Sequence, residues 1–134
     1  MSLAVNPGTT NEKIQRSVLA LSLLGLIAGC QLTASEPLQP TANQDIIESA
    51  KNELDGIEEL EVSDEGVITF TQRLRTPGTY WIPARIKELS YDISCVQLSY
   101  FIDRGMVVKS AFLGARGRVE YYDMERCMKD TPFQ

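Results

Sequence analysis

The hydrophobic period of the chain changes at Gly56, and this change constrains the fold more than any other feature. Before Gly56, Ile46, Ala50 and Leu54 recur at the four-residue spacing of one helix face. After Gly56, apolar and polar residues alternate, which is typical of strands with one buried face. The sequence therefore predicts an α+β fold, in which one N-terminal amphipathic helix packs on an antiparallel β-meander of five or six strands.

The helix is expected to begin near Asn43 or Thr41, either of which can cap it, and to end at Gly56. Prolines, glycines and turn residues then divide the rest of the chain. The expected strands cover residues 60–62, 68–74, 80–82, 91–102, 106–113 and 118–122, with a helical turn at 83–89, a hairpin loop at 103–105 and a final turn at 123–129.

A short apolar segment precedes this domain. Residues 17–29 follow Lys13 and Arg16 and end at Cys30. The segment is shorter than the roughly 20 apolar residues that a membrane-spanning helix needs. Its length and its positive flank are typical of the hydrophobic region of a signal peptide.

Residues 26–30, Leu-Ile-Ala-Gly-Cys, resemble the lipobox of a bacterial lipoprotein signal peptide. This resemblance implies that residues 1–29 are a cleaved signal peptide and that Cys30 carries diacylglycerol and acyl (palmitate-type) chains. Residues 30–42 would then be the lipidated cysteine and a flexible tether, and residues 43–134 a small periplasmic domain. Glutamine rather than aspartate at position 31 implies transport to the outer membrane, with the domain facing the periplasm.

Two other interpretations of the apolar segment stay open. It could be an uncleaved short anchor with Cys30 as an ordinary thiol, or a buried helix that ends in Ala-Gly-Cys. The positive flank, the short apolar region and the small residues before Cys30 all agree with the signal peptide of a lipoprotein.

Cys95 and Cys127 are the cysteines left after Cys30. In an oxidising periplasm such a pair is expected to form one disulfide. Closing a loop of about 33 residues would stabilise the domain by about 3–4 kcal/mol through the entropy of the unfolded chain. The alternative is two reduced cysteines that are buried separately.

Charge is distributed unevenly. Residues 36–65 carry ten acids and one base, whereas residues 66–134 carry ten bases and seven acids. The simplest interpretation is an acidic helix near a mildly basic sheet, with most charges solvated. A chain with a net charge of −5 does not have the basic balance of a nucleic-acid-binding protein.

Catalytic patterns are sparse in the sequence. The chain contains no histidine, which excludes Ser-His and Cys-His nucleophiles and zinc motifs built on histidine. No phosphate-binding or dinucleotide fingerprint is present, so no cofactor and no metal is expected. A carboxylate pair for glycan cleavage would have to come from acids such as Asp92, Asp103, Glu120 and Asp123, and the sequence does not favour any two of them.

Aromatic residues stand beside cations in two segments, and Tyr, Trp and Arg are enriched at interface hot spots. The candidate binding residues are Tyr80, Trp81, Arg85, Lys87, Arg116 and Arg118. They could form a face for an acidic envelope protein or an anionic cell-wall polymer, or the rings could fill the core while the cations are solvated.

We therefore expect a non-catalytic lipoprotein that is anchored to the membrane by lipid and acts as a binding or assembly module in the bacterial envelope. The alternatives are a structural subunit of an envelope complex held by an uncleaved N-terminal helix, and a small carboxylate-dependent glycan hydrolase.

Overall fold

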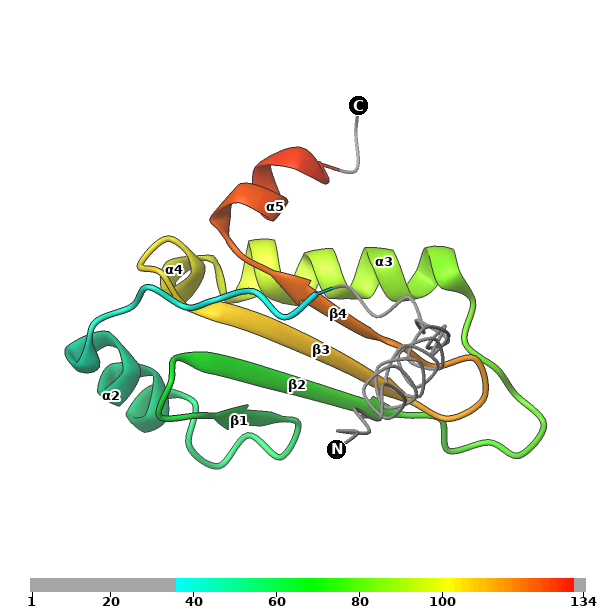
Figure 1. Cartoon of the computed structure of the whole chain (residues 1–134). Coiled ribbons are helices and arrows are strands. Elements are labelled where there is room, and N and C mark those ends of the chain that lie inside the picture. The colour runs from blue at the N-terminus through cyan, green and yellow to red at the C-terminus, as the bar shows by residue number, and fades with distance from the viewer. Residues whose placement is uncertain (1–35, 132–134) are drawn as a thin grey trace, which may run out of the picture. The chain divides into compact units, whose positions relative to one another are not determined.

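The computed structural model describes residues 36–131. The expectations for residues 1–35, including the cleavage and lipidation at Cys30, lie outside the described residues. The elements in chain order are α2 (Gln44–Glu53), β1 (Leu60–Val62), β2 (Val67–Arg73), α3 (Pro83–Tyr91), the π-helix η1 (Asp92–Gln97), α4 (Ser99–Ile102), β3 (Val107–Leu113), β4 (Val119–Tyr122) and α5 (Met124–Lys129) (Figure 1). Between residues 36 and 131, none of these helices has the length and apolar character that crossing a membrane requires.

The four strands form one mixed sheet in the order β1-β2-β3-β4. The two outer pairs, β1 with β2 and β3 with β4, are antiparallel, whereas the central strands β2 and β3 are parallel. The α+β class is confirmed. The expected antiparallel meander of five or six strands is wrong for the described part of the chain, which has four strands and a parallel central pair.

One segment accounts for the difference between the expected and the observed sheet. Residues 91–102 alternate like a strand, but they complete α3 and form η1 and α4. A helical connection of this length carries the chain back to the starting end of β2, so that β3 runs in the same direction as β2. The hairpin loop expected at residues 103–105 is therefore a helix-to-strand connection, with Gly105 at a φ of +91°.

Residues 80–82 are also not a strand. The backbone NH of Trp81 donates to the carbonyl oxygen of Ala115 at 2.9 Å, but no ladder forms around this bond. Pro83 occupies the first turn of α3 directly afterwards, where its missing NH has no effect on the helix. The helical turn expected at residues 83–89 is confirmed and extends to Tyr91.

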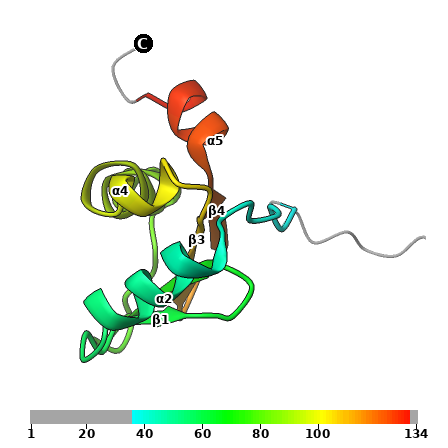
Figure 2. The same cartoon turned by 90° about the vertical axis from the view of Figure 1, so that its left-hand side faces the viewer.

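Helices α2 and α4 lie on one face of the sheet (Figure 2), and the main core fills the space between them and that face. Ile68, Val108 and Tyr122 are aligned on that face by the strand registers. The buried residues packed with them come from α2, η1, α4 and the start of β3: Ile47, Ala50, Leu98, Phe101, Ile102 and Met106. A second, smaller cluster of Trp81, Ile86 and Phe112 fills the space between α3 and the far end of β3.

Helix α2 occupies the position expected for the helix at the start of the domain, and it ends at Glu53, before the expected end at Gly56. Asn43 caps it, because the side-chain oxygen of Asn43 accepts a hydrogen bond from the NH of Ile46 at 3.0 Å. Contacts with the domain begin before residue 43. The NH groups of Thr41 and Ala42 both donate to the carbonyl oxygen of Gly105, at 2.8 and 3.0 Å.

Candidate functional site

Two chain segments meet where the parallel strands β2 and β3 end. The NH of Leu74 donates to the carbonyl oxygen of Leu113 at 3.2 Å, and the Trp81–Ala115 bond ties the next loop to the β3–β4 turn. Residues 73–82 and 113–118 therefore form one continuous surface, which we call the arginine end. Parallel strands bring both segments to the same edge because their carboxyl ends coincide there.

The arginine end carries positive charge without nearby compensation in its own segments. It contains Arg73, Arg75, Arg116 and Arg118 and no acidic residue. All four arginines are exposed. Arg118 pairs with Glu120 at 2.8 Å, whereas Arg73, Arg75 and Arg116 form no ion pair with any residue between 36 and 131. Three guanidinium groups are thus free to bind carboxylate or phosphate oxygens in the two-point manner that arginine favours.

Tyr80 and Arg116 stack on each other at this surface. The guanidinium carbon of Arg116 lies 4.2 Å from the centre of the Tyr80 ring. Arg116 has a φ of +58°, and it is the non-glycine residue in the described chain with a positive φ. Such a backbone conformation costs about 1 kcal/mol or more in a residue other than glycine, and strained residues of this kind cluster at functional sites. Tyr80 and Ile82 stay 53% and 57% exposed, so aromatic and aliphatic surface lies beside the free arginines.

Of the six binding residues expected from the sequence, the structure brings Tyr80, Arg116 and Arg118 together. The expectation that Trp81 belongs to an exposed binding face is wrong, because its side chain is only 7% exposed and is part of the smaller core cluster. Its ring centre lies 4.9 Å from that of Phe112, and its indole NH donates to the carbonyl oxygen of Leu113 at 3.1 Å. Trp81 thus packs under the loops of the arginine end and is not accessible to a partner.

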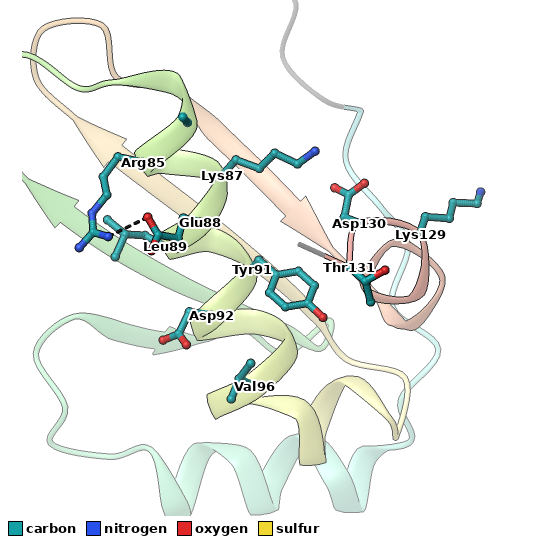
Figure 3. A pocket seen from close by; sticks show the side chains of 11 residues that line it. Arg85, Lys87, Glu88, Leu89, Tyr91, Asp92, Val96, Lys129, Asp130 and Thr131 are labelled. Carbon is teal, nitrogen blue, oxygen red and sulfur yellow. Dashed lines mark hydrogen bonds and ion pairs between the residues drawn. The ribbon is translucent and has the colours of Figure 1, made fainter. Parts of the chain in front are cut away.

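Arg85 and Lys87 lie on α3, next to the arginine end in the sequence but over a different hollow. They help to line an open groove of about 960 Å³ between α3–η1 and the end of α5. Lys87 and Tyr91 point from α3 toward Asp130 and Thr131, while Arg85 turns away and pairs with Glu88 at 2.8 Å (Figure 3). The groove mixes both signs of charge, so it lacks the consistent charge of the arginine end.

The disulfide between Cys95 and Cys127 is confirmed, with an S–S distance of 2.03 Å. It joins η1 to α5, a helix of six residues with no buried residue of its own. The expected final turn at residues 123–129 is therefore a short helix that the disulfide holds against the domain.

A network of charged groups also docks α5. The guanidinium of Arg126 binds Glu120 at 2.6 Å, Asp130 at 3.2 Å and the carbonyl oxygen of Tyr121 at 2.5 Å, and it lies 4.2 Å from the centre of the Tyr122 ring. Burial lowers the pKa of Arg126, but the hydrogen bonds to the carboxylates outweigh it and raise that pKa. Burial raises the pKa of Tyr122 to about 12. This network serves the stability of the domain.

Three of the four carboxylates considered for glycan cleavage have structural partners. Asp92 accepts from Gln97 at 2.7 Å, Glu120 binds two arginines, and Asp123 caps α5 by accepting from the NH of Arg126 at 2.8 Å. Asp103 is exposed at the end of α4. In residues 36–131, no group of three or more histidine, cysteine or acidic residues could hold a metal ion.

Sequence reasoning missed Arg73 and Arg75. Both lie where β2 ends, directly before the turn Thr-Pro-Gly at residues 76–78. Their position became informative only once β3 was known to run parallel to β2, because only this topology places the β2 end beside Arg116.

Comparisons of the chain with protein-family models, with curated proteins and with solved structures find no match. The functional argument therefore depends on the residues and the geometry of this chain.

Proposed function

We propose that the chain is a lipid-anchored lipoprotein of the bacterial envelope whose domain binds an envelope protein or an anionic cell-wall polymer through the arginine end, without catalysis. The lipobox-like residues 26–30 support the anchor, and Gln31 supports the outer membrane as its location. The Cys95–Cys127 disulfide supports an oxidising compartment such as the periplasm.

The observation that carries the binding proposal is the imbalance of charge at the arginine end. Four arginines occur there without an acid in the same segments, and three of them have no ion-pair partner in the described chain. A solvated surface of a soluble domain normally mixes both signs of charge. An excess of one sign beside exposed Tyr80 and Ile82 is the composition of a surface that recognises an anionic partner.

Photo-crosslinking in living cells tests this proposal. A photoreactive amino acid is placed at Tyr80, Ile82 or Arg116, and matched controls carry it at Val96 or Met128, which are exposed on η1 and α5. We expect the first three positions to capture the same envelope component and the two controls to capture little of it. Equal capture at all five positions, or no capture at the arginine end, would refute the proposal.

A further inference from the structure

The two halves of the described domain do not neutralise each other. Six ion pairs occur in residues 36–131, and none of them joins an acid of residues 36–65 to a base of residues 66–131. Lys51–Asp64 is the one pair within the first half. The acidic and basic halves of the domain are therefore not joined by ion pairs, and unpaired charges of both signs stay on the surface.

The unpaired acids line one side of the domain. Strand β1 is at the edge of the sheet, and Asp55, Glu58, Glu59 and Glu61 precede or lie on it. All four are exposed. We call this side, residues 55–61, the acidic edge. It also exposes one large apolar side chain, Ile57, at 43%.

The acidic edge is hollowed. An open pocket of about 270 Å³ lies there, with Leu54, Leu60 and Val62 as its apolar lining. Its polar lining is Asp55, Glu61 and Lys51, and Lys51 is already paired with Asp64. The arginine end presents complementary features: Tyr80 and Ile82 are exposed there, and the Arg116 guanidinium stacks on the Tyr80 ring. An apolar centre within a charged rim is the usual anatomy of a protein–protein interface.

We infer that the partner of the arginine end is the acidic edge of a second copy of this chain. This inference rests on the proposed function and specifies its partner. The free arginines of one copy would pair with Asp55, Glu58 and Glu59 of the next, while Tyr80 or Ile82 packs against the apolar lining of the hollow. Because the two patches differ, the contact is heterologous and each copy keeps one free patch, so the copies can add in a chain or close into a ring.

A lipid anchor makes this contact more favourable. Copies tethered to one membrane surface meet at a much higher effective concentration than free copies. A contact built on charge pairs is also weakened by salt, because exposed charges are screened within about 8–10 Å at physiological ionic strength. The association is therefore expected to depend strongly on ionic strength.

The test measures the molar mass of the full-length protein in detergent by analytical ultracentrifugation, with two charge-reversed variants. One variant carries Arg73→Glu and Arg75→Glu, and the other carries Asp55→Lys, Glu58→Lys and Glu59→Lys. The control, Asp103→Lys, reverses an exposed acid at the end of α4.

We expect the native protein and the control to have at least twice the monomer mass at low ionic strength and to dissociate in high salt. Each variant alone should be monomeric, since like charges would then face each other. A mixture of the two variants should associate again, because each reversed patch meets its complement or a native patch finds its native partner. This rescue shows that both variants are folded.

A native protein that stays monomeric at low ionic strength would overturn the inference, and so would a mixture that fails to associate. The failure of the proposed function is distinguishable from this result. If crosslinking at Tyr80 captures a different envelope component while the native protein is monomeric, the arginine end is a binding surface and only the choice of partner is wrong.

Discussion

Arg126 and Glu120 form the most deeply buried ion pair of the described chain, with 2.6 Å between guanidinium nitrogen and carboxylate oxygen. Glu120 is only 7% exposed and lies on β4, whereas Arg126 lies on α5. The pair therefore fixes the C-terminal helix to the edge of the sheet.

Replacing Arg126 with alanine should lower the free energy of unfolding by about 1.5–3 kcal/mol, because the charge-assisted hydrogen bonds to Glu120 and Asp130 are lost while Arg118 still compensates Glu120. Lys129→Ala is the matched control, since the Lys129–Glu125 pair is exposed to solvent and contributes little to stability. Urea denaturation measures both values. Equal losses in the two variants would contradict the structural role of Arg126.

Removing the disulfide with Cys95→Ala and Cys127→Ala should cost about 3–4 kcal/mol of stability, because the unfolded chain regains the freedom of the closed loop. Hydrogen exchange should accelerate more in α5 than in α2, since α5 has no buried residue of its own. Uniform acceleration over both helices would show that the bond does not act locally on α5.

Gly105 is predicted to be intolerant of a side chain. A Cβ there would lie 2.5 Å from the Thr41 hydroxyl oxygen and 2.8 Å from the Ala42 nitrogen. Gly105→Ala should destabilise the domain and expose residues 40–42 to proteases. Gly56→Ala is the control: its φ of +81° is similarly strained in alanine, at about 1 kcal/mol. Apart from its chain neighbours, no atom of residues 36–131 lies within 4 Å of the new Cβ. Urea denaturation measures the free energy of unfolding of both variants. The additional loss in Gly105→Ala reports the clash of the new Cβ with Thr41 and Ala42.

The Tyr122 hydroxyl should make the domain sensitive to alkaline pH. Its pKa is raised from 10.0 to about 12 in the folded protein, so the folded state keeps this proton over a range in which the unfolded state loses it. The corresponding stability is fully present below pH 10 and is lost as the pH rises toward 12, by about 2–3 kcal/mol.

Unfolding measured from pH 9 to pH 12 checks this expectation. Tyr122→Phe should show a shallower loss than the native protein, and Tyr121→Phe, on the opposite face of β4, should not. Parallel curves for the native protein and Tyr122→Phe would contradict the prediction.

Much of the fold was predictable because its elements have clear periods and caps. The apolar stripe of α2, its Asn43 cap and the strands at residues 60–62, 67–73, 107–113 and 119–122 all follow from local patterns. Residues 91–102 were misassigned because polar residues interrupt the apolar spacing of their buried helix face. The inward positions from Ile86 are Ser90, Ser94 and Leu98, all buried, and the two serines interrupt the apolar spacing.

Strand propensity was a second source of error in the same segment. Ile93, Val96 and Tyr100 favour strands, but packing against the sheet overrides propensity. The hydroxyls of Ser90 and Ser94 have no hydrogen-bond partner among residues 36–131, so these two positions place polar atoms within the buried face of the helix. Only Tyr80, Arg116 and Arg118 of the arginine end could be predicted from the sequence. The nearness of Arg73 and Arg75 to them depends on the parallel pairing of β2 and β3, which was missed once residues 91–102 were assigned to a strand.

The claim on which all these proposals depend is that the domain is an oxidised, lipid-anchored module of the envelope. The most direct measurement is the intact mass of the untagged protein, extracted from its native membrane without reductant. The account predicts a chain that starts at Cys30, carries diacylglycerol and acyl mass, and is lighter by the two hydrogens lost in the Cys95–Cys127 bond. An unmodified full-length mass would contradict the lipid anchor and would favour a subunit held by an uncleaved N-terminal segment.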